Sequence, residues 1–124
     1  MYADYEFYRD IYGGTLISQE DFDKRAFQAS VYIDEMTFSR LKNGWPVTEE
    51  VQYACCSVAE TIQEYSNQET RLSAVGVKSE NVDGYSVTYE DPAQLRQSFK
   101  NTKLDALAIY IPSSHPLRYA GGDP

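Results

Sequence analysis

The chain has 124 residues, which is enough for one hydrophobic core and too short for two ordinary domains. Apolar residues make up 42% of it and charged residues 24%, so the composition predicts a folded chain rather than a disordered one. The net charge of −8 and the scattered lysines and arginines disfavour a sequence-independent nucleic-acid binder, because that affinity comes from cations that neutralise phosphates.

The N-terminal segment 1–17 is rich in aromatic side chains and should pack, either on the chain's own core or on a neighbouring subunit. Its candidate subunit or partner contacts are Tyr2, Tyr5, Phe7, Tyr8 and Tyr12. No apolar run approaches the roughly 20 residues that span a bilayer, and the basic start of a signal peptide is missing. We therefore expect a soluble protein that is made in the cytoplasm and does not contact membranes.

A first long helix is predicted after residue 17. Ser18 with Asp21 resembles a capping box. Apolar residues at helical spacing then draw one stripe: Phe22, Ala26, Ala29, Ile33 and Met36. Further apolar residues widen the stripe and predict a helix of about 24 residues that is buried on more than one side; they are Phe27, Val31, Phe38 and Leu41.

A second helix is predicted after the turn "NGWP" at 43–46, with Thr48 as its cap. Its stripe consists of Val51, Cys55, Val58, Ile62 and Tyr65, and we expect the helix to end between Tyr65 and Arg71. Neighbouring residues on a helix point about 100° apart, a poor geometry for a disulfide or a shared metal site between Cys55 and Cys56. The sequence predicts two free thiols, with Cys55 on the core side.

The stretch "NVDGYSVTYED" at 81–91 predicts a β-hairpin over 75–90, because Asp83-Gly84 favours a type I′ turn and valines and tyrosines flank it. One face of this ribbon can pack. The other is polar and uncharged, with Ser79, Asn81, Ser86 and Thr88. The hairpin either folds back on the helices or pairs with hairpins of neighbouring copies in a closed ring, which would remove its unpaired edges.

A third helix begins at Asp91-Pro92 with an N-cap and a proline at its first position, and its apolar side extends to Ile111 before Pro112 ends it. The fold class is thus mainly α, a small bundle of three main helices with one inserted hairpin in a single domain 1–111, followed by a flexible tail 112–124. The core residues expected where the helices meet are Phe22, Ile33, Val58, Ile62, Leu95 and Phe99.

No residue pattern predicts catalysis, a metal site or a cofactor. His115 is the only histidine and lies in the tail, so an exposed loop side chain is favoured over a catalytic base or metal ligand. The clustered carboxylates begin helices, where the helix dipole favours them. The pairs Gly13-Gly14 and Gly121-Gly122 lack the strand, helix and lysine of a phosphate-binding loop. The sequence predicts a scaffold rather than an enzyme.

The order of several segments resembles the head-tail connector (adaptor) proteins of long-tailed phages and of prophages in Gram-positive bacteria. These segments are "MYADYEFYRDIYGGTLI", the helix with "YIDEMTF" and Arg40, the helix near "EEVQYACCSVAE", the stretch "VKSENVDGYSVTYED", and the end "PLRYAGG". The resemblance covers nearly the whole chain, and its most specific part is the hairpin.

The resemblance implies a ring of about a dozen copies beneath the portal protein, at the virion neck, assembled in the host cytoplasm. It places the loop between the second and third helices toward a channel through which DNA passes without specific binding. The channel residues implied are Lys78, Ser79, Glu80, Asn81, Asp83, Gly84, Tyr85, Ser86, Thr88 and Tyr89. The C-terminal residues Leu117, Arg118 and Tyr119 would meet the portal, and a downstream neck or tail-completion protein would be a further partner. The acidic charge suits a conduit along which a polyanion slides.

The alternative is a small acidic regulator or adaptor that binds one protein partner through the aromatic N-terminal segment and forms no ring. A ring builder is expected to self-associate, whereas this regulator is expected to stay monomeric or dimeric.

Overall fold

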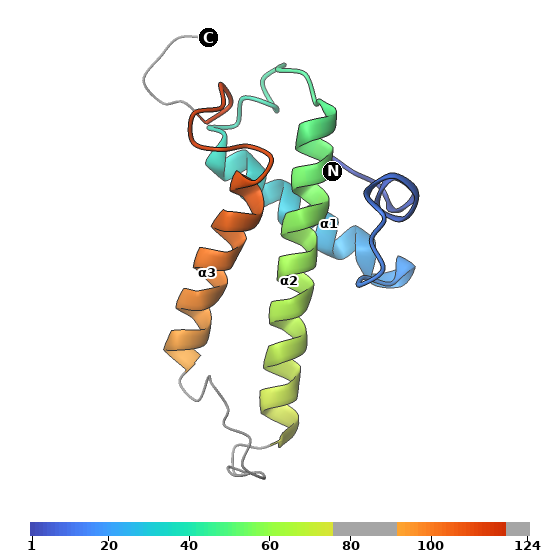
Figure 1. Cartoon of the computed structure of the whole chain (residues 1–124), viewed down its shortest axis with the longest axis vertical. Helices are drawn as coiled ribbons and strands as arrows, with labels where there is room; N and C mark the ends of the chain where they lie inside the picture. Colours follow the sequence, from blue (N-terminus) through green and yellow to red (C-terminus); the bar gives the residue numbers. More distant parts are fainter. Residues whose placement is uncertain (76–91, 119–124) are drawn as a thin grey trace.

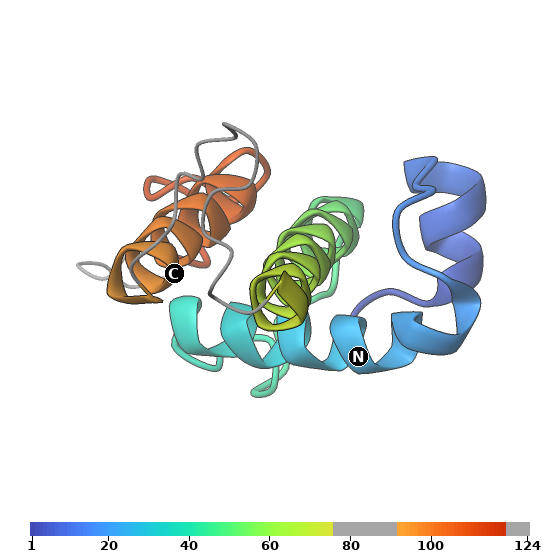
Figure 2. The ribbon, with the colours of Figure 1, turned by 90° about the horizontal axis from the view of Figure 1, so that it is seen from below.

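The computed structural model describes residues 1–75 and 92–118. Within these ranges it contains four helical elements and no strand: η1 (Phe7–Tyr12), α1 (Gln19–Met36), α2 (Glu49–Val75) and α3 (Pro92–Ala108). α2 and α3 lie side by side, and α1 crosses α2 (Figure 1). The view from below places η1 and α3 on opposite sides of α2, with α1 beneath it (Figure 2). The predicted mainly α fold is confirmed, and the hairpin, except for Val75, lies outside the described residues.

α1 begins as predicted and ends earlier. The Ser18 side chain accepts a hydrogen bond from the Asp21 amide at 3.3 Å, which confirms the N-cap. The helix then has 18 residues rather than about 24. Phe38 and Ser39 have φ values of 58° and 57°, in the left-handed region that a right-handed helix cannot contain. The chain turns there, and Leu41 becomes buried through this turn rather than through the helix.

α2 is longer than the sequence predicted, since it continues to Val75 instead of ending between Tyr65 and Arg71. Its second half has a partner in α3. The rings of Tyr65 and Phe99 stack with their centroids 4.1 Å apart, and this contact lies where the apolar stripe of α2 becomes weak in the sequence. Tertiary packing therefore favours helix over a segment whose own composition predicted an end.

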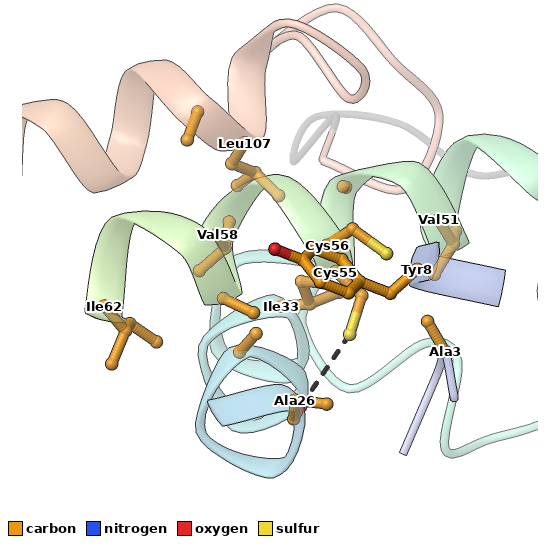
Figure 3. Packing of buried hydrophobic residues seen from close by; sticks show 14 of the residues in the cluster. Ala3, Tyr8, Ala26, Ile33, Val51, Cys55, Cys56, Val58, Ile62 and Leu107 are labelled. Atoms are coloured by element: carbon orange, nitrogen blue, oxygen red, sulfur yellow. Dashed lines mark hydrogen bonds between the residues drawn. The ribbon is translucent and has the colours of Figure 1, made fainter. Parts of the chain in front are cut away.

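The core lies where α1, α2 and the N-terminal segment meet (Figure 3). Five of the six predicted core residues are buried, and the sixth, Phe99, is half-buried. The prediction that Phe27, Val31 and Phe38 widen the buried stripe of the first helix is wrong, because these side chains are 62%, 52% and 52% exposed. Phe27 and Val31 lie on the side of α1 away from Ile33, and α2 covers only the other side of that helix; Phe38 lies in the turn after it.

The N-terminal segment packs on the chain's own core, which is the first of the two alternatives for it. The Phe7 ring meets Tyr53 of α2 edge-on at 5.4 Å between centroids, and Tyr53 in turn stacks on Tyr110 at 5.6 Å. Gly13, at φ 80°, ends η1 in the left-handed conformation. A Cβ on Gly14 would lie 2.1 Å from Cε1 of Tyr8, so this position needs glycine for close approach.

Residues 112–118 correct the prediction of a flexible tail that begins at Pro112. This segment forms successive turns in which the His115 amide donates to the Pro112 carbonyl and the Arg118 amide donates to the His115 carbonyl, both at 2.8 Å. Leu117 is only 3% exposed and belongs to the core. Pro112 and Pro116 rule out a long helix and still permit tight turns, which let the apolar Leu117 side chain reach the core.

Candidate functional site

The predicted channel hairpin lies outside the described residues. This holds for every one of its site residues: Lys78, Ser79, Glu80, Asn81, Asp83, Gly84, Tyr85, Ser86, Thr88 and Tyr89. What the structure does place is the pair of helix ends that this segment joins. The last residue of α2 and the first of α3 lie beyond α1, at the end of the molecule away from η1 (Figure 1).

Among the N-terminal aromatic residues predicted as partner contacts, Phe7 and Tyr8 are buried in the core. Tyr2, Tyr5 and Tyr12 are half-buried and pack against it. The Tyr2 hydroxyl donates to the Asp34 carboxylate of α1, and the Tyr2 amide donates to Ser30 Oγ at 3.1 Å. A partner contact through this segment stays a prediction for the exposed parts of these three side chains.

Tyr8 is a polar junction that the sequence did not reveal. Its hydroxyl accepts hydrogen bonds from the amides of Leu16 at 2.9 Å and Ile17 at 3.0 Å, and it donates to Glu60 Oε2 at 2.8 Å. Burial raises the pKa of Tyr8, the Ile17 amide opposes that shift, and the hydrogen bond to Glu60 adds to it. The neutral phenol thus joins η1, the loop before α1 and α2.

Both cysteines are fully buried, which confirms the predicted packing of Cys55 and places Cys56 in the core as well. Cys55 Sγ points toward α1 and lies 3.7 Å from the Ala26 carbonyl oxygen (Figure 3). Burial raises the pKa of both thiols, and for Cys56 the neighbouring Cys55 adds to the shift. A thiol kept neutral and away from solvent is a weak nucleophile and metal ligand.

The C-terminal segment is fixed by Arg40, a residue that entered the sequence analysis only through the resemblance. Its guanidinium lies 5.1 Å from the Phe38 ring centroid and 5.2 Å from that of Trp45, and it donates a hydrogen bond to the Pro116 carbonyl. Of the predicted portal contacts, Leu117 is buried, Arg118 donates to the Ile111 carbonyl at 3.1 Å, and Tyr119 lies outside the described residues.

His115 is half-buried rather than exposed, which corrects the expectation for it. Its Nδ1 accepts from the Leu117 amide at 3.1 Å, so in the neutral ring Nε2 carries the proton and donates to Glu50 Oε1 at 3.2 Å. The contact joins the C-terminal segment to the first turn of α2, and turns in the chain rather than sequence spacing bring the two residues together. This geometry fits a structural role in which His115 holds the C-terminal segment against α2.

Several large apolar side chains are exposed away from the core. Phe27, Val31 and Phe38 lie on the outer side of α1 and in the turn after it. Others lie at the two sides of the molecule: Ile11 and Leu16 beside η1, and Leu104 and Ile109 on or after α3.

A small cavity of about 160 Å³ lies between α2 and α3. It is lined by Thr61, Glu64, Tyr65, Gln68, Ser98, Phe99 and Thr102. Across residues 1–75 and 92–118, no three His, Cys, Asp or Glu side chains come close enough to hold a metal ion. No helix within the same ranges is both long and apolar enough to cross a membrane.

Comparison with known proteins gave no family model, no curated protein and no solved structure that matches the chain.

Proposed function

We propose that this protein is a head-tail connector subunit, a structural component that forms a ring below a phage portal and joins the capsid to the tail. The observation that supports the proposal is that α2 ends and α3 begins at the same end of the molecule. The two helices run side by side beyond α1 to that end (Figure 1). Copies arranged in a ring can direct that end toward a common axis while η1 and α3 face neighbouring copies.

The sequence of this segment suits the lining of a channel for DNA. It carries the polar uncharged face of Ser79, Asn81, Ser86 and Thr88, and the chain as a whole has a net charge of −8. A surface with this chemistry does not hold the DNA backbone, because binding needs cations that pair with phosphates. The DNA then passes through the ring without specific binding, and no cofactor takes part.

The portal protein is the main proposed partner, with a downstream neck or tail-completion protein on the other side of the ring. The portal contact proposed for Leu117, Arg118 and Tyr119 is supported least at Leu117, because that side chain is buried in the core. The rival regulator has less support from the fold, since the N-terminal aromatic strip that would bind its partner buries Phe7 and Tyr8.

The test is co-expression with the portal protein encoded beside this gene, followed by native mass spectrometry of the purified complex. The proposal predicts a portal with a bound ring of about a dozen copies. A variant tests the predicted hairpin. Gly84→Val disfavours the positive φ of a type I′ turn. The matched control is Asp83→Asn, since Asn-Gly favours the same turn.

Gly84→Val is expected to leave the helical circular dichroism signal intact and to abolish the ring, whereas Asp83→Asn retains it. Wild-type protein that never binds the portal would contradict the connector role. A Gly84→Val variant that still forms the ring and supports phage assembly would contradict the channel role of the segment and leave the connector role standing.

A further inference from the structure

Charge is distributed unevenly between the two sides of the molecule. Residues 1–23, which comprise η1 and the start of α1, contain six carboxylates and one arginine. Residues 92–118, which comprise α3 and the C-terminal segment, contain four lysines and arginines and one carboxylate. Both views place these two parts on opposite sides of α2 (Figures 1 and 2). The protein is therefore acidic overall but has one basic side.

α3 carries exposed cations and exposed aliphatic residues, and Arg96 lies close enough to Tyr65 of α2 to oppose the rise that burial causes in the pKa of that phenol. Arg96, Lys100 and Leu104 are exposed, with Leu104 at 38%, and Ile109 just after the helix is 69% exposed. At about 100° per residue, Arg96, Lys100 and Leu104 fall on one side of the helix and Asp105 on the opposite flank. We call the surface formed by Arg96, Lys100, Leu104 and Ile109 the α3 face.

Lys103 differs from the exposed Arg96 and Lys100 because it is half-buried. Its Nζ lies 4.5 Å from the Tyr32 ring centroid and 4.6 Å from that of Phe99. Burial lowers the pKa of Lys103, and Glu35 of α1 opposes that shift. Arg96 and Lys100 form no salt bridge with residues 1–75 or 92–118.

The opposite side has the complementary composition. Glu6, Asp10 and Glu20 are exposed, and Ile11 and Leu16 of the same N-terminal part are 54% and 40% exposed. Arg9 pairs with Asp10 at 2.7 Å and neutralises part of this charge. The remaining carboxylates have no cation within salt-bridge distance in the described structure. We call the surface formed by Glu6, Asp10, Ile11, Leu16 and Glu20 the η1 face.

We propose that the α3 face of one copy binds the η1 face of the next copy, with Leu104 and Ile109 against Ile11 and Leu16 and the cations against the carboxylates. Each face thus offers aliphatic side chains together with one sign of charge, as a specific protein contact requires. Because the faces differ and belong to elements on opposite sides of α2 (Figure 2), a copy that uses one of them keeps the other free. The contact is therefore head-to-tail and repeats.

This inference rests on the proposed ring and names the surfaces that build it. A second copy is the favoured partner, because the chain itself carries both complementary surfaces. A nucleic acid would satisfy the α3 face alone and would leave the exposed aliphatic residues of the η1 face without a role. A two-fold dimer would place each face against its own copy or bury both at once, and it would stop growing.

The experiment is sedimentation velocity on the full chain over rising concentration, in about 50 mM and about 500 mM salt. Self-association with more than two copies is expected at low salt, and the dissociation constant should rise about tenfold or more at high salt. A chain that is monomeric at millimolar concentration, or that stops at a dimer, overturns the proposal. So does association that is insensitive to salt.

Charge reversal identifies the faces. The variant Arg96→Glu/Lys100→Glu and the variant Glu6→Lys/Glu20→Lys should each lose self-association about tenfold or more, because like charges then meet. An equimolar mixture of the two should associate again, since each altered face meets its altered complement. Loss without recovery in the mixture overturns the pairing.

Two controls separate charge complementarity from damage to the fold. Arg96→Lys/Lys100→Arg keeps the sign of the α3 face and should associate like the wild type. Glu64→Lys reverses a charge on α2 outside both faces and should also have no effect. If either control loses association as strongly as the reversed variants, the proposed contact is wrong.

The outcome is separable from that of the connector proposal. Copies that associate through these faces and never bind the portal contradict only the connector role. Portal-bound rings whose stability is unaffected by both reversed variants contradict only the assignment of the faces.

Discussion

Replacement of Tyr8 by phenylalanine tests how the N-terminal segment is held. The change removes only the hydroxyl, which accepts hydrogen bonds from the amides of Leu16 and Ile17 and donates one to the carboxylate of Glu60. Ile17 is 2% exposed, so its amide loses its acceptor in a place that water reaches poorly. The ring itself, with its stack on Phe22 at 5.0 Å between centroids, is retained.

The magnitude follows from these contacts. A buried amide without a partner costs about 1–3 kcal/mol, and the lost bond to Glu60 adds to that figure, although the half-buried carboxylate regains water. We expect Tyr8→Phe to lower the free energy of unfolding by about 2–4 kcal/mol. With a typical urea dependence of about 1–3 kcal/mol per molar, the unfolding midpoint should fall by about 1–2 M.

The assay is urea unfolding followed by circular dichroism, combined with amide hydrogen exchange. Exchange at the Leu16 and Ile17 amides should accelerate more than exchange in the middle of α2, because the lost bonds are local. Tyr12→Phe is the matched control, since its hydroxyl lies 3.5 Å from Glu60 Oε1 and contacts the Ser57 side chain but accepts from no buried amide in the described residues. A Tyr8→Phe loss below about 0.5 kcal/mol, or unchanged exchange at both amides, would refute the reasoning.

Three further predictions concern stability. Ile33→Ala should cost about 2–5 kcal/mol because Ile33 is fully buried, whereas Val31→Ala, at a 52% exposed site, should cost less than about 0.5 kcal/mol; equal losses in urea unfolding would mean that the α1 faces are misassigned. Gly14→Ala should cost about 1–3 kcal/mol because its Cβ meets the Tyr8 ring, and a thermal melt like that of the wild type would contradict this close approach. Stability should fall as the pH rises above about 9, because burial raises the pKa of Cys56 in the folded chain above its ordinary 9.0, so that only the unfolded thiol ionises there. Below that pH the thiol is neutral in both states, and its contribution to the free energy of unfolding is fully present. Cys56→Ala should reduce the loss of stability at high pH. Urea midpoints that stay constant up to about pH 10 would contradict the prediction.

The sequence determined the elements whose signals are local. The Ser18 cap set the start of α1, and the spacing from Phe22 to Ile33 identified its buried side, because each signal depends on residues within one or two helical turns. Proline at position 92 likewise marked the start of α3. The packing of the N-terminal aromatic residues followed from their composition, although the sequence left open whether they pack on this chain or on another.

Tertiary structure decided what depends on distant residues. Phe27 and Val31 fit a widened apolar stripe, and they are exposed because no helix among residues 1–75 and 92–118 covers that side of α1. α2 extends to Val75 beside α3, where Phe99 stacks on Tyr65. Three contacts join residues more than 50 positions apart: Tyr8 with Glu60, His115 with Glu50, and Arg40 with Pro116. No periodicity encodes such pairs, because the path of the whole chain brings them together. The placement of the acidic and basic segments on opposite sides of the molecule has the same origin. The sequence determines their charges, but α2 between them determines where they lie.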